Sequence, residues 1–412
     1  MDEIGEVETP SYFVCLISMQ IMRDPVTVCT GVTYDRESIE KWLFTMGNNT
    51  CPATMRVLDN RDLTPNHTLR RLIQHWSAAN SSAGVPFTAT PDPPLDVNHL
   101  NELLRDIRSC PVPTFSVKAL KELRSLAKKS ETNRRCVALS EAPAALISVL
   151  ETQSAEADET GCGYDDAVAC EEALGILHSL IPLPDETVEL LASAKCLASM
   201  ASILKRGTSN ARFHAAVVSQ TVSRKCVERF VLNANDDLIE GLLEVLTEEV
   251  CEQATVAALR VLTTMTLNSR SSRIKAIEAG AVSALIELLP DQTAEKKNRC
   301  ERMLCLLDVL CGCAEGRAAM ADHAMGIPVV SKKIMRVSEL ASEKAVRILW
   351  SLCQFSPSEH VLNVMLQVGA VAKLCMVLQI DCTAKTKSKA MEMLKLHGKS
   401  WRNSPCAPSR IF

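Results

Sequence analysis

The stretch PSYFVCLISMQIMRDPVTVCTGVTYDRESIEKWL, residues 10–43, decides the fold of the first part of this chain. Within it, Val26–Val28 alternates apolar and polar side chains, which predicts a short strand, and Thr30–Gly31 predicts a turn. Asp35 is a suitable N-cap for a following helix, and Glu37 suits its first turn. The stretch therefore predicts a small α+β module.

Apolar spacing predicts two helices in this module. Ile39, Trp42 and Leu43 fall at i, i+3 and i+4, which places them on one helical face. A second helix is expected after Pro65, capped by Asn66. Its predicted inner face consists of Leu69, Leu72, Ile73 and Trp76.

The cysteines and histidines of this region are spaced wrongly for a metal site. Zinc takes four side chains, usually as Cys or Cys/His pairs such as C-x-x-C. The only candidates are unpaired: Cys15, Cys29, Cys51, His67 and His75. We therefore expect no metal and no cofactor, which disfavours a zinc-binding regulatory module. We expect both histidines to lie on a helix face.

Without a metal, hydrogen bonds, ion pairs and apolar packing must hold the loops, because buried polar groups need partners. The candidates for these contacts are Asp24, Thr30, Thr33, Asp35, Arg36 and Glu37. Cys15 lies between Val14 and Leu16, with no neighbouring base or cation to lower its pKa. It is thus predicted to be a packing residue and not a nucleophile.

Composition limits the class of protein. The chain has 412 residues, of which 47% are hydrophobic and 4% aromatic, so it can bury a large helical core. The net charge is −4, which argues against a nucleic-acid partner. There are 18 cysteines without a C-x-x-C pair, and the N-terminus is acidic and lacks an apolar core. No apolar run approaches the ~18 residues of a membrane span. These features predict a cytoplasmic chain with reduced thiols, associated with membranes only through partners.

From residue 97 onward the sequence is helical and repetitive. The clearest repeats are IKAIEAGAVSALIELL (274–289), HAMGIPVVSKKI (323–334) and VLNVMLQVGAVAKLCMVLQ (361–379). Their glycines, Gly280, Gly326 and Gly369, are about 45 residues apart, within the ~40–47 range of armadillo and HEAT repeats. Glycine suits a left-handed or crowded turn between helices. Because one short helical repeat cannot bury its apolar face alone, stacking is expected.

Weaker copies extend the array. They are EAPAALISVL (141–150), SAKCLASMASIL (193–204) and NDDLIEGLLEVL (235–246), which gives about six repeats with the first and last degenerate. The acidic stretch Glu151–Asp166 is expected to be an exposed insertion in the first repeat, with binding of a partner as the alternative.

The order of these signals resembles the U-box family of ubiquitin ligases, whose fold is RING-like and zinc-free. The residues that carry the resemblance are Cys15, Ile17–Ser18, Met22, Asp24–Val26, Thr30–Gly31, Thr33–Tyr34, Ile39, Trp42–Leu43, Cys51–Pro52 and Leu63–Asn66. The pattern G-A-V-x-x-L-I-x-L-L resembles armadillo repeats. The whole chain is therefore similar to plant U-box armadillo E3 ubiquitin ligases.

This resemblance implies a mainly α fold, with a small α+β U-box followed by an armadillo α-solenoid. We predict a U-box at 8–80, a linker at 81–96, armadillo-type repeats at 97–384 and a basic C-terminal helix and tail at 385–412. Within the U-box, the resemblance gives structural roles to Cys15, Asp24, Pro25, Tyr34 and Asp35.

By the same resemblance, a U-box docks a ubiquitin-conjugating enzyme (E2) that is already charged with ubiquitin. The family's contact positions fall on Ile17 and Met19 in a first loop, Trp42 in the helix and Pro52 in a second loop. The alternative is that these residues are ordinary core. Many members bridge both proteins with an arginine after the second loop. Met55 occupies the nearest position here, so Arg56 is the predicted bridge.

The ligase is expected to position the charged partner for direct transfer to substrate lysines, without a covalent intermediate of its own. The armadillo repeats should bind the protein substrate in a concave groove. The groove shows no regular Asn or Trp pattern of the kind that nuclear import receptors display.

The stretches TYDRESIEKWLF, LTPNHTLRRLIQ, VSKKIMRVSE and LKLHGKSWR resemble the subgroup implicated in stress and immune signalling. Family members act as monomers or pairs, so a homo-oligomer is possible. The alternative function is a non-catalytic armadillo scaffold with an inactive U-box, which the departures Leu16 and Met55 would mark.

Overall fold

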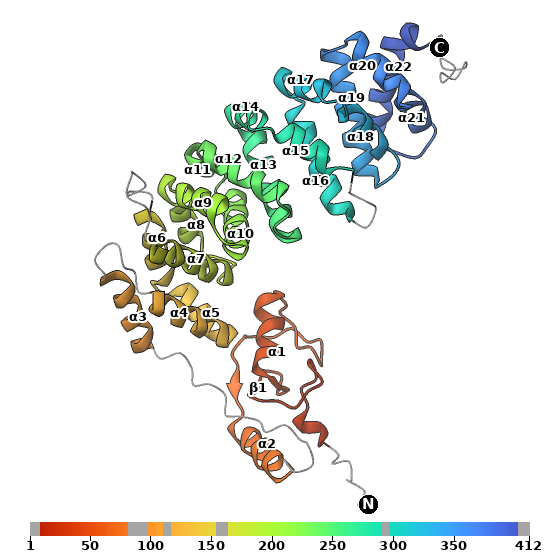
Figure 1. Cartoon of the computed structure of the whole chain (residues 1–412). Helices are drawn as coiled ribbons and strands as arrows, with labels where there is room; N and C mark the ends of the chain where they lie inside the picture. Colours follow the sequence, from red (N-terminus) through yellow and green to blue (C-terminus); the bar gives the residue numbers. More distant parts are fainter. Residues whose placement is uncertain (1–8, 81–96, 110–116, 154–163, 291–295, 403–412) are drawn as a thin grey trace, which may run out of the picture. The chain divides into compact units, whose positions relative to one another are not determined.

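The structure is a computed structural model that describes residues 9–80, 97–109, 117–153, 164–290 and 296–402 (Figure 1). It comprises two compact units. Unit 1 consists of Met1–Ser109 and Lys118–Ala142, and unit 2 of Cys110–Val117 and Pro143–Phe412. The predicted linker at 81–96, the middle of the predicted insertion (154–163) and the end of the tail (403–412) lie outside the described residues.

The front module, residues 9–80 of unit 1, contains a three-stranded antiparallel sheet in the order β2-β1-β3. The strands are β1 (Pro25–Thr27), β2 (Thr33–Asp35) and β3 (Thr64–Pro65). Val26 faces Tyr34 on one side and Pro65 on the other. The predicted strand therefore forms, shifted by one residue, and Gly31 makes the turn with φ +81°.

The helices of the module follow the predicted spacing. A short 3-10 helix, η1 (Ser11–Phe13), precedes the sheet, and α1 (Arg36–Glu40) continues as a π-helical turn, η2 (Lys41–Thr45). Ile39 and Leu43 are fully buried, whereas Trp42 is half-buried. The predicted apolar face therefore includes Trp42 only in part.

The second helix, α2 (His67–Ala79), begins as predicted: the N–H of Leu69 donates to the Asn66 side chain at 3.0 Å. Ile73 is buried and packs in the core, but Leu72 is exposed, so its predicted place on the inner face is wrong. The reason is the phase of the helix, because Ile73 faces the sheet and its neighbour Leu72 is turned away. His67 and His75 lie exposed on this helix, as predicted.

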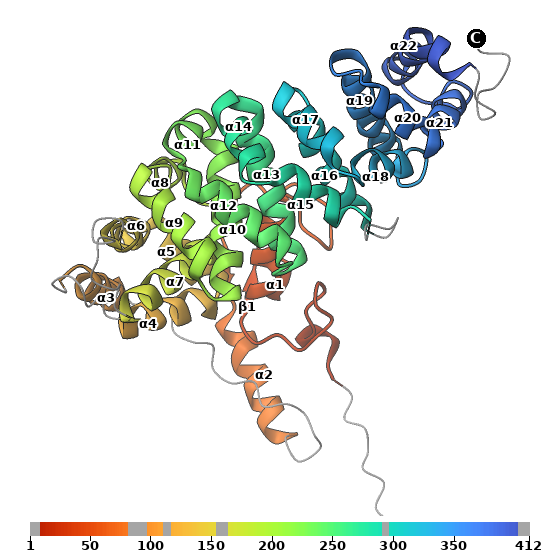
Figure 2. The same cartoon turned by 45° about the horizontal axis from the view of Figure 1, so that its top comes forward.

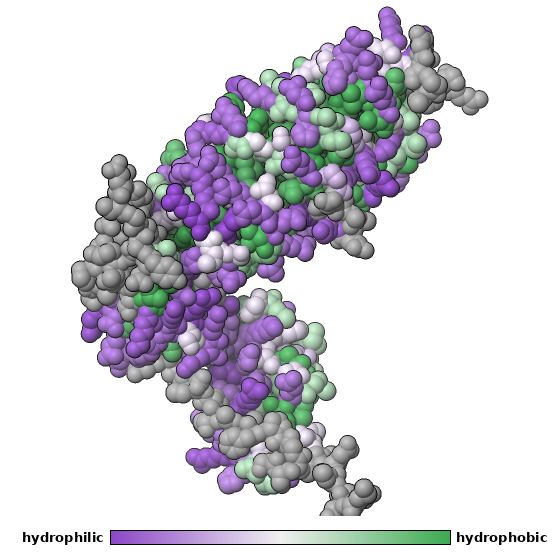
Figure 3. Space-filling view, viewed as in Figure 1, coloured by the Kyte–Doolittle hydropathy of each residue, from purple (hydrophilic) through white to green (hydrophobic). Residues whose placement is uncertain are grey.

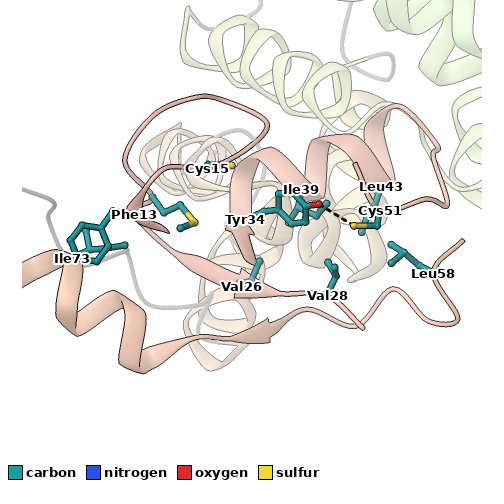
Figure 4. Packing of buried hydrophobic residues seen from close by; sticks show 11 residues of the cluster. Phe13, Cys15, Val26, Val28, Tyr34, Ile39, Leu43, Cys51, Leu58 and Ile73 are labelled. Atoms are coloured by element: carbon teal, nitrogen blue, oxygen red, sulfur yellow. Dashed lines mark hydrogen bonds between the residues drawn. The ribbon is translucent and has the colours of Figure 1, made fainter. Parts of the chain in front are cut away.

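One apolar cluster forms the core of the front module (Figure 4). It is built around Tyr34, Ile39, Leu43 and Val26, with both loop cysteines, Cys15 and Cys51, inside it. Phe13 closes one end of this cluster and makes an edge-to-face contact with Trp76 of α2 at 5.6 Å. The two helices and the sheet thus share a single core.

Unit 1 also contains three helices that follow the front module in the chain: α3 (Val97–Ser109), α4 (Val117–Lys129) and α5 (Glu131–Leu139). Helix α5 contacts α1 of the front module. The Thr132 hydroxyl donates to the buried Glu40 carboxylate, and the Arg135 guanidinium lies 3.9 Å from the ring centroid of Phe44. Glu40 therefore has a polar partner in spite of its burial.

Unit 2 is a stack of helices that begins with α6 (Ala142–Gln153) and α7 (Tyr164–Ser179), which extend into both ends of the predicted insertion. Among the described residues, the helices that follow fall into five triplets (Figure 2). The first helices are α8 (Asp185–Leu191), α11 (Val227–Asn233), α14 (Arg270–Glu278), α17 (Ala314–Asp322) and α20 (Glu359–Gln367). The second helices are α9 (Ala194–Arg206), α12 (Asp236–Thr247), α15 (Ala281–Leu288), α18 (Gly326–Lys333) and α21 (Ala370–Val377).

The third helices are the longest: α10 (Ser209–Lys225), α13 (Glu252–Asn268), α16 (Lys297–Leu310), α19 (Glu339–Phe355) and α22 (Ala384–Trp401). Each contacts the third helix of the next triplet, so they form a row within unit 2. Helix α22 carries much of the predicted basic C-terminal segment, and its Trp401 and Leu394 are buried. It therefore covers the end of the apolar core.

The predicted turn glycines serve two different purposes. Gly280 and Gly369 adopt left-handed backbone, with φ of +85° and +70°. Gly326 instead begins α18 where space is short, because a Cβ there would lie 2.3 Å from the Met320 carbonyl oxygen. Unit 2 therefore contains both kinds of turn for which the sequence predicts glycine: turns with left-handed backbone and a crowded turn.

In the described part of the chain, no single helix combines the length and the apolar composition needed to cross a membrane. Two strongly bent pairs, α8 with α9 and α20 with α21, reach that length and composition only when each pair is taken together.

Candidate functional site

The first loop of the front module, Cys15–Gln20, is closed by backbone hydrogen bonds. The N–H of Cys15 donates to the carbonyl of Gln20, and the N–H of Met19 donates to that of Cys15, both at 2.8 Å. Val14 and Ile21 form an isolated antiparallel bridge at the base of the loop. Met19 adopts left-handed backbone with φ +56°, so its side chain points outward and is 74% exposed.

The second loop, Cys51–Arg56, repeats this construction. The N–H of Cys51 donates to the carbonyl of Arg56, and the N–H of Met55 donates to that of Cys51, both at 2.8 Å. Thr50 and Val57 form the bridge at the base. Met55 also has φ +56° and is 68% exposed. Left-handed backbone costs a non-glycine residue roughly 1–2 kcal/mol, so its presence twice indicates tightly determined loops.

The sequence carries a signal for this likeness that the pattern analysis missed. Both loops have the form Cys-x-x-x-Met: Cys15-Leu-Ile-Ser-Met19 and Cys51-Pro-Ala-Thr-Met55. A comparison of the two segments with each other would have aligned Met19 with Met55, and Leu16 with Pro52. Met55 is therefore the counterpart of a predicted contact residue, in addition to occupying the position of a missing arginine.

The two loop cysteines are fully buried, and their sulfur atoms accept hydrogen bonds. Cys15 Sγ accepts from the N–H of Asp35 at 3.3 Å. Cys51 Sγ accepts from the Thr30 hydroxyl at 3.3 Å and from the Tyr34 hydroxyl at 3.0 Å (Figure 4). Within the described residues, no group of three or more His, Cys, Asp or Glu side chains could hold a metal ion. Hydrogen bonds to sulfur therefore anchor both loops to the core.

Tyr34 also makes a second hydrogen bond, in which its hydroxyl oxygen accepts from the N–H of Ala53 at 2.9 Å. Burial opposes ionisation of the Cys51 thiol, but hydrogen bonds from Thr30, Thr54 and Tyr34 outweigh it and lower the pKa of Cys51 to about 6. Burial and the bond to Cys51 raise the pKa of Tyr34. The phenol therefore keeps its proton at neutral pH and donates it to the Cys51 sulfur.

Asp35 stands at the N-cap position of α1, but its side chain does not cap the helix. Its Oδ1 instead accepts from the N–H groups of Arg23 and Asp24 at 2.8 and 2.9 Å. Burial raises the pKa of the Asp35 carboxyl. The predicted capping contact is therefore wrong. The N–H groups of Arg23 and Asp24, in the segment that follows the first loop, bind the Asp35 carboxylate instead.

Asp24 links three segments. Its carboxylate pairs with Arg36 Nε of α1 at 2.6 Å and with Arg70 of α2. Of the other predicted polar residues, Thr33 bonds to Thr27 at 2.9 Å across the β1–β2 pair. The Glu37 side chain makes no hydrogen bond or ion pair among the described residues, and Glu40 pairs with Arg36 instead, at 3.7 Å. Glu37 is exposed to solvent, one helical turn before Glu40.

The structure places the predicted contact residues at the edge of the core. Ile17 and Trp42 are half-buried and pack against the apolar cluster. The indole N–H of Trp42 donates to the Thr50 carbonyl at 2.8 Å, which joins η2 to the second loop. Pro52 is half-buried, and Arg56 is exposed. Each of these side chains therefore has an accessible part.

Exposed apolar side chains gather on the two loops. Leu16 and Met19 of the first loop, and Met55 with the adjoining Val57, are each more than half exposed. Figure 3 shows apolar surface on the front module among largely polar surroundings. Exposed apolar groups held on fixed backbone indicate a protein-binding surface.

Comparison with known proteins agrees with this geometry. Residues 9–82 match the U-box domain family, and residues 99–412 match the family described as the plant U-box protein ARM repeat region. The chain belongs to the plant U-box proteins with armadillo repeats. The predicted fold class, an α+β U-box followed by an armadillo solenoid, is thereby confirmed.

Two relatives from Arabidopsis thaliana match along their whole length. E3 ubiquitin-protein ligase PUB23 is 40% identical over 416 residues, which cover 100% of this chain and 98% of that protein. E3 ubiquitin-protein ligase PUB22 is 38% identical over 430 residues, with coverage of 99% and 98%.

The substitution Tyr34→Phe tests the sulfur-anchored loop. It removes both hydrogen bonds of the fully buried Tyr34 hydroxyl, to Cys51 Sγ and to the N–H of Ala53, so we expect a loss of about 1–3 kcal/mol in the free energy of unfolding. Equilibrium urea unfolding of the full chain measures this loss. Tyr12→Phe, at an exposed tyrosine of the same module, is the matched control. Equal unfolding curves for the two variants would contradict the assignment.

The low pKa of Cys51 predicts a pH dependence. Because the pKa falls from 9.0 to about 6 on folding, the stabilisation is complete above pH ~9 and is lost as the pH falls through about 6. The stability of the native chain relative to Cys51→Ser should therefore decrease from pH 9 to pH 5.5. Urea unfolding across this range measures it, with Cys29→Ser as the control for loss of a thiol. A constant difference would refute the thiolate.

Proposed function

We propose that this chain is an E3 ubiquitin-protein ligase. Its U-box recruits an E2 charged with ubiquitin and promotes direct transfer of ubiquitin to lysines of a substrate that the armadillo repeats hold. One observation carries the proposal: two matching loops, each closed by backbone hydrogen bonds, present exposed methionines beside half-buried apolar residues. Membership of the plant U-box family and the names of PUB22 and PUB23 support the same activity.

The docking surface of this proposal consists of Ile17, Met19, Trp42 and Pro52, to which the structure adds Met55. These side chains sit on backbone that is already fixed by the buried cysteines and by the Trp42–Thr50 bond. Less conformational entropy is then lost on binding, so a small apolar surface suffices for a transient partner. Methionine suits such a surface because it is flexible and polarisable.

Direct transfer is supported by the state of the loop cysteines. Neither Cys15 nor Cys51 has any exposed area, so neither thiol can attack the thioester of a docked partner. The chain would accelerate transfer by holding the charged partner in a reactive conformation, through positioning and population shift.

Arg56 is proposed to bridge the E2 and its ubiquitin. It directly follows Met55 and is exposed, and its carbonyl accepts the closing bond of the loop from Cys51 at 2.8 Å. The backbone at this position is therefore fixed, while the guanidinium is free to donate several hydrogen bonds to a partner.

The armadillo repeats are proposed to select the substrate, since stacked repeats offer a long continuous surface. The resemblance to the stress and immune subgroup suggests stress or defence signalling as the setting of this activity. Location in the cytoplasm, pairing of two copies and the limits of the predicted domains stay predictions of the sequence.

The experiment is a discharge assay, in which an E2 loaded with ubiquitin loses it faster in the presence of the full chain. Met19→Asp, Ile17→Asp and Pro52→Ala should each lower this acceleration about tenfold or more, because they remove or charge the docking surface. Leu232→Asp, at an exposed leucine of α11, is the matched control. The acceleration should persist in a chelator.

Met19→Asp is the decisive variant, because an exposed side chain can be changed without disturbing the core. Full acceleration by Met19→Asp and Ile17→Asp would refute the docking surface. No acceleration by the native chain with any member of a panel of E2 enzymes would favour a non-catalytic scaffold.

The role of Arg56 has its own test. Arg56→Ala should slow discharge far more than it weakens the affinity for the uncharged E2, because the contact of the bridge with ubiquitin is lost only in the charged complex. Arg61→Ala, also exposed on the U-box, is the control. If affinity and discharge fall together, Arg56 is a docking residue and not a bridge.

A further inference from the structure

Three neighbouring third helices of unit 2 each carry an arginine in the same local setting. Arg260 of α13 and Arg347 of α19 hold the same place in their helices, each eight residues beyond the first. Arg302 of α16 shares their sequence context, in which arginine is followed by an apolar residue and leucine. We call these three residues the arginine row.

The side chains of the row point away from the core. The two residues after each arginine are buried: Val261 and Leu262, Met303 and Leu304, and Ile348 and Leu349. Arg260 and Arg347 themselves are exposed, and Arg302 is half-buried. Because α13 contacts α16, and α16 contacts α19, the row crosses three successive repeats (Figure 2).

Positive charge in the row is only partly neutralised. Arg347 pairs with Asp308 at 3.3 Å, and Lys344 lies 3.5 Å from the same carboxylate. Among the described residues, no carboxylate lies within ion-pair distance of Arg260 or Arg302. The Glu301 carboxylate, next to Arg302 in the sequence, instead accepts from the Ser338 hydroxyl at 2.6 Å and lies 3.9 Å from Lys297 Nζ.

Two further observations favour an anionic ligand for the arginine row. The Nε of Arg302 is buried and has no hydrogen-bond partner among the described residues. Partial burial and the neighbouring guanidinium groups of Arg302 and of Arg224 on α10 lower the pKa of Arg260. Like charges held together with an unused buried donor are costly unless a partner supplies negative charge.

The spacing indicates the form of that partner. Packed helices lie about 8–10 Å apart, and we take this axial distance as the spacing of the row. Three residues of polyproline II advance about 9.3 Å and return the side chain to the same face. A carboxylate at every third residue of an extended chain therefore matches the row.

We propose that the arginine row binds an extended acidic segment of a protein substrate, with carboxylates at i, i+3 and i+6. This inference rests on the proposed function, in which the repeats hold the substrate. A protein segment is the proposed occupant because the proposed function gives the repeats a protein substrate. Arg260 and Arg302 contribute most, since Arg347 must exchange Asp308 for the ligand.

The experiment uses the full chain and a nine-residue fluorescent peptide with Glu at every third position in a Pro/Ser background. Fluorescence anisotropy should show binding that weakens strongly at high salt. Arg260→Glu and Arg302→Glu should each weaken binding about tenfold or more, and Arg347→Glu less. Arg260→Gln and Arg302→Gln, which do not add a negative charge, should show smaller losses. Arg206→Glu, at an exposed arginine of α9, should bind like the native chain.

Three peptides distinguish the outcomes. A Gln peptide should not bind, and a peptide with the same glutamates in one block should bind at least fivefold more weakly. Equal binding of the blocked peptide overturns the proposed spacing. No binding of the periodic peptide, or binding of a single-stranded RNA in its place, overturns the inference.

The result is independent of ligase activity, because the titration contains neither E2 nor ubiquitin. A chain that discharges its partner but ignores the peptide refutes only this inference. A chain that binds the peptide but discharges nothing refutes only the proposed function.

Discussion

Two consecutive residues of one short strand hold both loops of the U-box. Tyr34 reaches the second loop, where its hydroxyl lies between Cys51 Sγ and the N–H of Ala53. Asp35 reaches the first, where its N–H donates to Cys15 Sγ, and its carboxylate accepts from the N–H groups of Arg23 and Asp24 in the segment that follows that loop. Because adjacent residues of a strand point to opposite sides, β2 can serve two loops at once.

The remainder of the module depends on this strand. Asp24, held by Asp35, pairs in turn with Arg36 and Arg70, so the second loop, the first loop and both helices form one connected network. Buried polar networks stabilise only when their members are satisfied. The same network explains the left-handed backbone of Met19 and Met55. The closed loops hold both residues in this strained conformation, which would relax if the loops opened.

Unit 2 uses a different principle, in which similar helices repeat and each buries its apolar face on the next. Such an array repeats its surface as well as its core. A residue type that occupies the same outward position in successive third helices becomes a row, and Arg260, Arg302 and Arg347 form one. The U-box gathers exposed apolar side chains on two loops, whereas the array distributes its arginines along its length. The partners proposed for the two surfaces differ in the same way: a folded E2 and an extended segment of a substrate.

Several features followed from the sequence by itself because they are local. The Asn66 cap depends on the N–H three residues later, and the left-handed glycines depend on the missing Cβ. Burial of Ile39 and Leu43 follows from helical spacing. The order of many such signals was enough to recognise the family.

The tertiary structure alone decided which groups meet. The Asp35 carboxylate binds the N–H groups of Arg23 and Asp24 and does not cap its own helix. Glu40, and not Glu37, pairs with Arg36, and Leu72 is exposed. The tertiary structure also brought Thr30 and Tyr34 to Cys51, and placed Arg302 beside Arg260, 42 residues away in the chain. Such contacts join segments far apart in sequence, and their strength depends on distance and burial. A one-dimensional pattern contains the residue types but neither of those quantities.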